Sequence, residues 1–252
     1  MLSRKEILIE KDPEVGILML HGFTSVPGQF EELADYLSSR GFTVYAPFIA
    51  GHGTTPEDLE KTTSKDWAES AKNAYLDLRK RVKKVIIIGN SFGSNLGFWL
   101  AKEMDNEPVG IISLGAPIFL RWQGFIKFRL KAYGRFRRFY SKPSRIYKTD
   151  YTDMKDEVSY PVIPIKSLEE FLSFIEKETM LNLDKVKIPV LIANANGDTV
   201  IHKSSASYIF SHIGSAIKEV FWFNSNQHGV AGSGCEGLFP KIHSFINEII
   251  KT

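Results

Sequence analysis

A serine flanked by two glycines follows an apolar run in this chain. Val85-Ile86-Ile87-Ile88 is followed by Gly89-Asn90-Ser91-Phe92-Gly93 and then by a helical pattern. A sharp strand-to-helix turn places the serine in a strained backbone conformation, and the two glycines remove side chains that would collide with it. The hydroxyl of Ser91 is then exposed above the sheet, at a helix N-terminus that favours developing negative charge. The pattern predicts a nucleophile, with a tight turn and an incidental serine as the alternative.

A serine hydroxyl becomes a good nucleophile when a positioned base takes its proton, and that base needs an acid to orient it. His228 lies in a loop that follows a strand expected to end at Phe223, where a parallel sheet presents its carboxyl end. Asp198 ends a turn after the preceding strand, 30 residues before His228. The chain order Ser, Asp, His therefore predicts Asp198 as the acid and His228 as the base. Helix capping is the alternative role for Asp198.

Two backbone N–H groups must stabilise the negative charge that develops on the attacked carbonyl oxygen. One is expected from the residue after the nucleophile, Phe92, and the other from a loop after an early strand. Leu18-Met19-Leu20-His21-Gly22-Phe23-Thr24 fits that loop, which makes Phe23 the second donor. We expect His21 to brace this loop. His52, between Gly51 and Gly53, is either a pocket-lining or a structural residue.

The elements that must position these residues follow an alternating pattern. Short β-branched runs alternate with helical patterns, which is typical of a mostly parallel sheet covered by helices on both faces. Strands are expected at residues 7–10, 15–20, 43–46, 85–88, 110–114, 190–193 and 219–223, and helices at 30–39, 64–81, 94–104, 167–178, 204–213 and 239–251. The sequence therefore predicts the α/β class.

The alternation is interrupted between Pro117 and Ile188. Residues 119–150 contain ten Lys or Arg and one acid, a net charge of +9 in a chain whose formal charge is +3. Nine aromatic residues interleave with these cations at roughly helical spacing. This segment differs from its neighbours and is predicted to be an insertion.

The composition excludes several classes of protein. With 43% hydrophobic residues in 252, the chain is not disordered, and the single cysteine, Cys235, excludes a disulfide scaffold. The chain contains no apolar run of the ~20 residues needed to cross a bilayer, and the alternating charges of its first residues differ from a signal peptide. We expect a soluble, cytoplasmic protein.

Together these residues resemble the α/β-hydrolase superfamily, in particular the small bacterial and archaeal carboxylesterases related to monoacylglycerol lipases. The resemblance covers nearly the whole chain. Besides the glycine-flanked serine, it rests on His21-Gly22-Phe23-Thr24, Tyr45-Ala46-Pro47, Gly51-His52-Gly53, Pro56-Glu57-Asp58-Leu59, Asp66-Trp67, Gly115-Ala116-Pro117, Gly197-Asp198 and His228. Relatives often carry Leu or His at the position of Asn90 and Ser-Gly at that of Asn226-Gln227, so this chain has extra amide groups there.

The resemblance implies a fold and a set of roles. In such esterases the matching positions are the nucleophile (Ser91), the acid (Asp198), the base (His228) and the oxyanion donors (Phe23 and Phe92). It also implies a core of residues 1–118 and 181–252 and an inserted helical lid, residues 119–180, over the acyl pocket. His52, Trp122 and Phe125 are expected to contact the substrate.

The implied reaction is hydrolysis of short- to medium-chain acyl esters, including monoacylglycerols or esters of aromatic acids, through an acyl-enzyme. The resemblance implies no metal and no organic cofactor. A thioesterase, an acyltransferase and a non-catalytic ligand-binding protein on the same fold are the alternatives. The basic, aromatic segment suggests that anionic substrates are steered to the pocket or that the protein associates weakly with an anionic lipid surface. Nucleic acid is not expected as a partner, because no recognised nucleic-acid-binding fold surrounds these residues.

Overall fold

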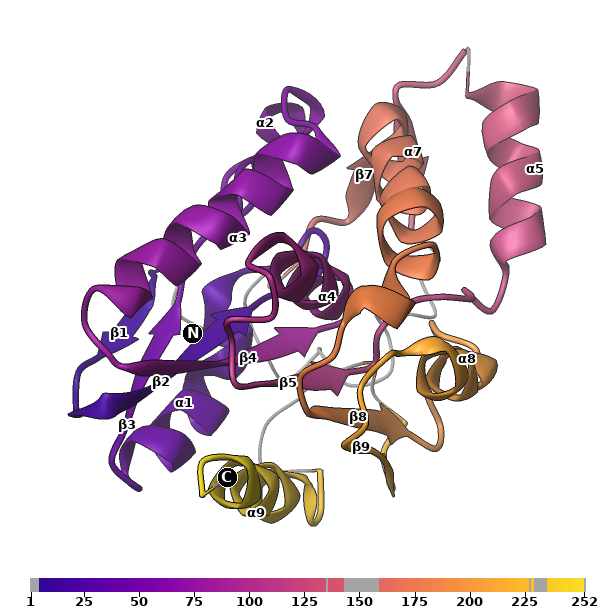
Figure 1. Ribbon diagram of the computed structural model, residues 1–252. Helices are drawn as coiled ribbons and strands as arrows, with labels where there is room; N and C mark the ends of the chain where they lie inside the picture. The colour runs from indigo at the N-terminus through magenta and orange to yellow at the C-terminus, as the bar shows by residue number, and fades with distance from the viewer. Residues whose placement is uncertain (1–4, 135, 143–158, 227, 229–234, 252) are drawn as a thin grey trace.

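A seven-stranded sheet forms the centre of the computed structural model, which describes residues 5–134, 136–142, 159–226, 228 and 235–251 (Figure 1). The strands, in their spatial order, are β1 (Ile7–Ile9), β3 (Phe42–Ala46), β2 (Asp12–Leu20), β4 (Lys84–Asn90), β5 (Gly110–Leu114), β8 (Val190–Ala195) and β9 (Lys218–Phe223). Strand β1 is antiparallel to β3, and all other neighbours are parallel. The predicted α/β class and its seven strands are confirmed.

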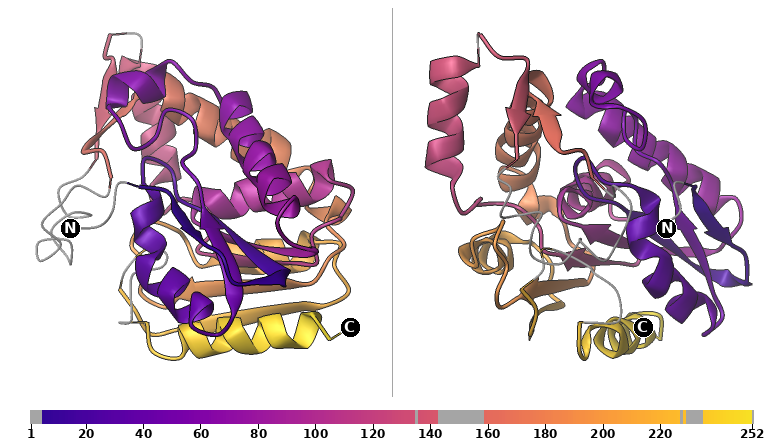
Figure 2. Two further views of the ribbon diagram at one scale, coloured as in Figure 1. Left: turned by 90° about the vertical axis from the view of Figure 1, so that its left-hand side faces the viewer. Right: turned by 180° about the vertical axis from the view of Figure 1, so that it is seen from behind.

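Helices cover both faces of this sheet (Figures 1 and 2). Helices α1 (Glu31–Ser38) and α9 (Leu238–Ile249) pack on one face, and α3 (Ser64–Arg79), α4 (Phe92–Glu103) and α8 (Ser204–His212) pack on the other. Successive side chains of a strand point to opposite faces. Accordingly Ile17 and Met19 of β2 lie in the cluster with α1 and α9, whereas Leu18 and Leu20 lie in the cluster with α3 and α4.

Local capping explains where two of the helices begin. At the start of α3, the hydroxyl of Thr63 accepts from the backbone N–H of Asp66, and the carboxylate of Asp66 accepts from the N–H of Thr63, so two otherwise unpaired donors are satisfied. The short helix α2 (Pro56–Glu60), which the sequence analysis did not predict, begins in a similar way: Thr55 caps it and Pro56 is its first residue.

Residues 119–180, which we call the inserted segment, add a second group of elements. These are α5 (Gln123–Tyr133), the two-stranded antiparallel pair β6 (Phe139–Ser141) and β7 (Val162–Pro164), α7 (Ile165–Phe174) and the π-helical turn η2 (Ile175–Met180). Helix α7 and η2 occupy the predicted helix at 167–178, but the strand pair was not predicted. Helix α5 lies at the periphery of the molecule in Figure 1 and in the right view of Figure 2.

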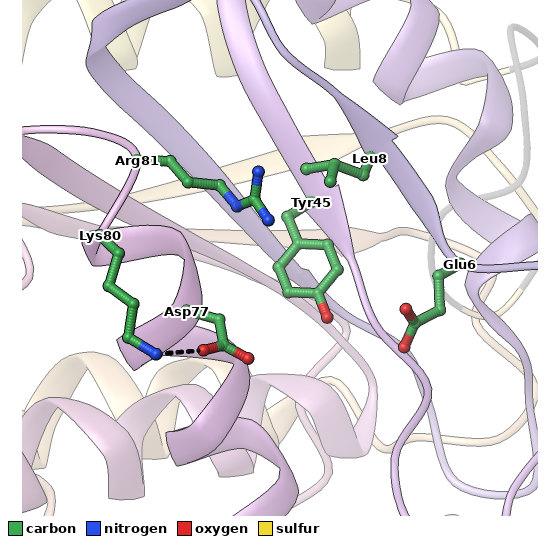
Figure 3. Close-up of a pocket in the computed structure, with 6 residues that line it drawn as sticks. All are labelled: Glu6, Leu8, Tyr45, Asp77, Lys80 and Arg81. Atoms are coloured by element: carbon green, nitrogen blue, oxygen red, sulfur yellow. Dashed lines mark hydrogen bonds and ion pairs between the residues drawn. The ribbon is translucent and has the colours of Figure 1, made fainter.

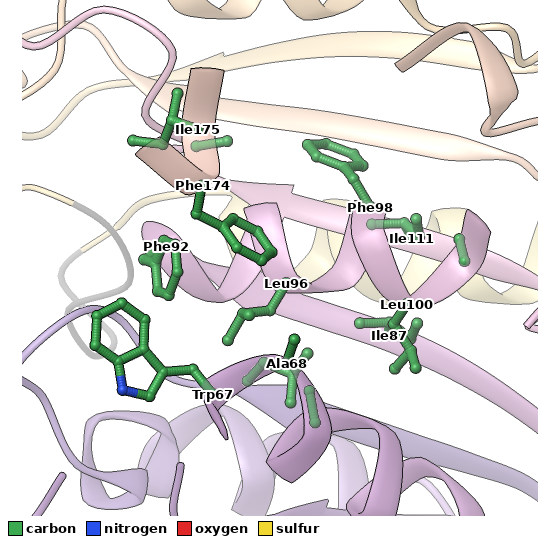
Figure 4. Packing of buried hydrophobic residues seen from close by; sticks show 14 of the residues in the cluster. Trp67, Ala68, Ile87, Phe92, Leu96, Phe98, Leu100, Ile111, Phe174 and Ile175 are labelled. Atoms are coloured by element: carbon green, nitrogen blue, oxygen red, sulfur yellow. The ribbon is translucent and has the colours of Figure 1, made fainter. Parts of the chain in front are cut away.

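Aromatic side chains join the inserted segment to the sheet-covering helices (Figure 4). The ring of Phe92 in α4 lies 5.6 Å from that of Trp67 in α3 and 5.3 Å from that of Phe174 in α7. Trp67 is fully buried, and its indole N–H donates to the hydroxyl of Thr62 at 2.8 Å. The inserted segment therefore packs on α3 and α4 through the same apolar cluster that covers the sheet.

Among the described residues, no helix has the length and apolar character needed to cross a bilayer.

Two backbone segments approach closely at Gly93, where α4 begins beside the end of β2. A Cβ atom at this position would lie 1.8 Å from the carbonyl oxygen of Leu20. We expect Gly93→Ala to lower the free energy of unfolding by more than about 2 kcal/mol, because backbone must move to admit the methyl group. Urea denaturation measures the change.

Gly124→Ala is the matched control, because a Cβ at Gly124 in α5 would meet no atom within 4 Å. Alanine is the better helix former, so this variant should unfold at an equal or higher urea concentration. Equal stability of the two variants would contradict the close approach at Gly93.

Candidate active site

Ser91 lies in the turn between β4 and α4, with φ 51° and ψ −120°. A positive φ is strained for a residue with a side chain and persists only where the surroundings hold it. The N–H of Ser91 donates to the carbonyl oxygen of Leu114 at the end of β5, at 2.7 Å. A Cβ at Gly89 would lie 2.4 Å from the backbone of Gly93. The strained turn expected from the sequence is therefore present.

The imidazole of His228 lies between Ser91 and Asp198. Its Nε2 is 2.8 Å from Ser91 Oγ, and its Nδ1 is 2.8 Å from Asp198 Oδ2. A carboxylate only accepts hydrogen bonds, so Nδ1 carries the proton and the lone pair of Nε2 faces the serine hydroxyl. The three residues follow the carboxyl ends of β4, β8 and β9, so the parallel sheet sets their separation.

Asp198 is almost completely buried yet favours its ionised form. Burial acts to raise the pKa of this carboxyl group, but His228 and the N–H groups of Ile201 and Val200 outweigh it and lower the pKa below its ordinary value. Those N–H groups donate to Oδ1 at 2.9 and 2.8 Å. Because α8 begins only at Ser204, the carboxylate stabilises the preceding turn, and the helix-capping alternative is wrong.

The loop after β2 passes directly beside Ser91. A Cβ at Gly22 would lie 3.3 Å from the Cβ of Ser91. The buried ring of His21 braces this loop, since Nε2 accepts from the N–H of Ile49 at 3.1 Å and Nδ1 donates to the carbonyl of Gly22 at 3.0 Å. Burial and the neighbouring His52 lower the pKa of His21 to about 3, so it is neutral at physiological pH.

His52 lies beneath the same loop. It is 3% exposed, its Nδ1 is 2.9 Å from the carbonyl oxygen of Ala50, and its ring contacts those of His21, Phe23 and Trp67. Burial lowers the pKa of His52 to about 4. This packing favours the structural alternative for His52, and a contact with substrate stays a prediction.

Trp122 and Phe125, the other predicted substrate contacts, lie at the start and within the first turns of α5. Their exposed fractions are 70% and 56%, and their predicted role is not tested by this placement. Asn90, which precedes the nucleophile, is buried and donates to the side-chain oxygen of Gln29 at 2.9 Å. Gln227 lies outside the described residues.

The sequence analysis did not predict the two side chains, Lys142 and Phe171, through which the inserted segment contacts the loop after β2. Lys142 Nζ lies 2.6 Å from both Thr24 Oγ1 and Ser159 Oγ, and burial lowers the pKa of Lys142 to about 7. The ring of Phe171 stacks on that of Phe23 at 4.8 Å and 15°. The sequence gives no signal for the first contact, because Lys142 is one of ten basic residues in its stretch.

The surface of the described residues includes hollows of different sizes. One, of about 230 Å³, adjoins the turn after β8 and includes Asp198, Arg121 and His202 in its lining. Another, of about 420 Å³, lies at the outer edge of the sheet between β1, β3 and the end of α3 (Figure 3). Glu6, Leu8, Tyr45, Asp77, Lys80 and Arg81 line it. It contains none of the residues predicted to act in catalysis.

Solved structures with the same architecture define the class of fold. A structure described with LipS and LipT, two metagenome-derived lipolytic enzymes, has a TM-score of 0.86 at 24% identity and covers 97% of this chain and 98% of its own. The monoacylglycerol lipase of Paleococcus ferrophilus has a TM-score of 0.77 at 14% identity, with 98% of each chain covered. The chain has the α/β-hydrolase fold.

Sequence comparison gives the family. The model of the family described as serine aminopeptidase, S33, matches residues 11–232. A thermostable monoacylglycerol lipase from Bacillus sp. (strain H-257) is 31% identical over 228 residues, covering 90% of this chain and 88% of that protein. A carboxylesterase from Bacillus subtilis (strain 168) is 26% identical over 225 residues, 86% of each. The chain belongs to the S33 family of α/β-hydrolases and is a serine hydrolase, as the resemblance implied.

The burial of His21 and His52 predicts that the protein is less stable at acid pH. Folding lowers the pKa of His52 from 6.5 to about 4, so the unfolded chain binds the proton more readily between these values. The free energy of unfolding therefore increases as pH rises through this window and decreases as pH falls through it. The change is up to about 1.4 kcal/mol per pH unit for each such histidine. His52→Asn, which keeps a donor for Ala50, should make this dependence less steep in urea denaturation between pH 4.5 and 6.5.

His212→Asn is the matched control. His212 is exposed in α8, and its Nδ1 lies 2.8 Å from the carbonyl oxygen of Tyr208, so asparagine replaces a similar hydrogen bond there. It should keep the wild-type slope. An unchanged slope in His52→Asn would show that burial of His52 does not exclude its charged form.

Proposed function

We propose that this serine hydrolase cleaves carboxylic esters with short- to medium-chain acyl groups, including monoacylglycerols or esters of aromatic acids. The observation that carries the proposal is the continuous hydrogen-bonded chain from Asp198 through His228 to Ser91, with the serine in a strained turn. The names of the Bacillus relatives, a monoacylglycerol lipase and a carboxylesterase, support esters as the substrate class.

The reaction has two halves. Ser91 Oγ attacks the ester carbonyl while His228 Nε2 takes the hydroxyl proton, and the ionised Asp198 stabilises the imidazolium that forms. The tetrahedral intermediate collapses, the alcohol leaves with the proton from His228, and an acyl-enzyme remains on Ser91. A water molecule, deprotonated by His228, then attacks the acyl-enzyme, and the carboxylic acid leaves as Ser91 regains its proton.

The N–H groups of Phe92 and Phe23 are the proposed donors to the oxyanion. Phe92 is the first residue of α4, where backbone N–H groups have no acceptor within the helix. Phe23 follows Gly22, whose backbone passes beside Ser91. Two donors aimed at the developing charge stabilise the transition state more than the ground state.

The inserted segment is the proposed lid, on a core of residues 1–118 and 181–252. Its contacts support this role: Phe171 and Phe174 pack on the rings of Phe23 and Phe92, and Leu120 forms a bridge with Ile201 after β8. Phe92, Phe171 and Phe174 are buried, so the partly exposed ring of Phe23 is the apolar surface of this group that an acyl chain or an aromatic acid can contact.

Removing the nucleophile tests the proposal directly. We expect Ser91→Ala to lower kcat for p-nitrophenyl esters by at least about 10³-fold without loss of stability, because no other group supplies the covalent intermediate. A series from acetate to palmitate, measured under identical conditions, also gives the preferred acyl length. Ser207→Ala is the control, since Ser207 is an exposed serine of α8.

Retained hydrolysis in Ser91→Ala would exclude Ser91 as the nucleophile. If the wild-type protein hydrolyses no ester of the series, the esterase proposal is wrong, and thioesters become the next substrates to assay.

We also propose that the surface of α5 associates weakly with anionic lipid. Trp122, Phe125 and Phe128 recur every third residue and are 70%, 56% and 62% exposed. Lys127 and Lys131 lie on the same helix. Aromatic side chains insert at the headgroup boundary while cations attract anionic lipids, a combination typical of helices that lie on a membrane surface.

Vesicle co-sedimentation tests this association. The wild-type protein should bind phosphatidylglycerol vesicles and be released by salt, because screening weakens the attraction. Phe125→Ser with Phe128→Ser should lower the bound fraction, whereas Phe210→Ser, at an exposed phenylalanine of α8, should not. Equal binding to neutral phosphatidylcholine vesicles, or none to either, would contradict the proposal.

A further inference from the structure

Thr24 has a backbone conformation that is unusual for its residue type. It is the third residue of the turn from Gly22 to Ser25, which is closed by a hydrogen bond from the N–H of Ser25 to the carbonyl of Gly22 at 3.1 Å, and its φ is 64°. Glycine or asparagine is favoured at such a position, and a β-branched residue there is strained by about 1 to 3 kcal/mol. Contacts of Thr24 with its surroundings must offset this strain.

Those contacts come from the inserted segment. Thr24 Oγ1 lies 2.6 Å from Lys142 Nζ and 2.8 Å from Ser159 Oγ, and its hydroxyl donates to the carbonyl of Phe23 at 2.6 Å. The carbonyl oxygen of Thr24 accepts from the N–H of Tyr160 at 3.2 Å. The hydroxyl and the carbonyl of this 1% exposed residue are thus bonded to residues far along the chain.

The strand pair β6–β7 places Lys142 for this contact. Lys142 follows β6 directly, and its N–H donates to the carbonyl of Pro161, just before β7, at 3.2 Å. The same Nζ donates to Ser159 and to Thr24, both at 2.6 Å, so one amino group joins two hydroxyl groups from different parts of the chain.

A second contact reaches the neighbouring residue of the same turn. Phe171 of α7 stacks on Phe23 with a centroid distance of 4.8 Å and an interplanar angle of 15°. Both central residues of the turn, Phe23 and Thr24, are therefore held by the inserted segment, one through an apolar contact and the other through polar ones.

We propose that Lys142 is a positioning residue for the reaction: by holding Thr24 it keeps the turn, and with it the N–H of Phe23, oriented towards the oxyanion. The inference rests on the proposed function, in which that N–H is a donor. The N–H of Phe23 belongs to the first peptide unit of the turn and moves when the turn changes. The inserted segment then does more than cover the site, because the oxyanion hole is complete only when this segment is seated.

Loss of this contact should affect kcat more than KM, because the oxyanion carries its full charge only near the transition state. Displacement of catalytic groups by about 1 Å can cost up to 10²-fold in rate. With p-nitrophenyl butyrate as substrate, we expect Lys142→Met to lower kcat between about 10- and 100-fold while KM changes less than about twofold. Lys166→Met, at an exposed lysine of α7, is the matched control and should retain the wild-type kcat.

A second pair of variants separates positioning from folding. Thr24→Ser keeps the hydroxyl and should retain most of kcat. Thr24→Gly removes the hydroxyl but relieves the strain of the positive φ, so it should unfold at an equal or higher temperature while its kcat falls as in Lys142→Met. A merely structural role for the contact predicts instead that activity follows stability. This pair decides the question even where Lys142→Met fails to fold.

An alkylboronic acid gives an independent readout, because it forms a tetrahedral anion on the nucleophilic serine. Its inhibition constant should rise in Lys142→Met by about the factor by which kcat falls. The positioning role is overturned if folded Lys142→Met has the kcat of Lys166→Met, or if Thr24→Gly retains full kcat. The proposed function fails separately: the esterase reaction is wrong if the wild-type protein hydrolyses no ester, and Ser91 is not its nucleophile if Ser91→Ala still hydrolyses the ester.

Discussion

The active site depends on the close approach between the start of α4 and the end of β2. Gly93 faces the carbonyl of Leu20 with no room for a side chain, and Gly89 faces the first turn of α4 in the same way. Because the backbone is confined at both glycines, Ser91 between them is held at a positive φ, and its hydroxyl lies beyond the end of β4 beside His228. The same approach carries the loop after β2 past Ser91, so one packing constraint places the proposed nucleophile and the proposed oxyanion donor together.

The parallel sheet places Asp198 and His228 on the same edge as Ser91. Ser91 and Asp198 follow β4 and β8, whose residues are almost all buried, whereas His228 follows the less buried edge strand β9. The positions of all three depend on the sheet as well as on the loops. Two of the buried polar side chains around them are well paired. His21 lies between two backbone groups, and Asp198 accepts from two N–H groups as well as from His228.

The sequence predicts those features of the fold and of the site that depend on local patterns of residues. Seven strands were found from β-branched runs, and Ser91, Asp198 and His228 from glycine spacing and chain order, because each follows a strand in a turn of recognisable composition. Contacts between residues far apart in the chain are not marked by any local sequence pattern. Strands β6 and β7 have three residues each, too few to show a period of two, and Lys142 meets Thr24 across 118 residues. The burial of His52 under Phe23 depends on tertiary packing that its glycine neighbours do not indicate.

The inserted segment and the catalytic loops are best understood as one packed unit. Tyr160 donates its hydroxyl to the carbonyl of Gly51 at 3.2 Å and accepts from the N–H of Thr54 at 2.8 Å, so the segment also grips the loop that contains His52. His52 in turn packs against Phe23. A displacement of the segment near Tyr160 and Lys142 therefore disturbs both the loop that contains Phe23 and the loop that contains His52, which packs against Phe23. In the proposed mechanism, the lid role of the segment and the ordering of the loop that contains Phe23 are then coupled, because Tyr160, Lys142 and Phe171 of the segment contact these loops.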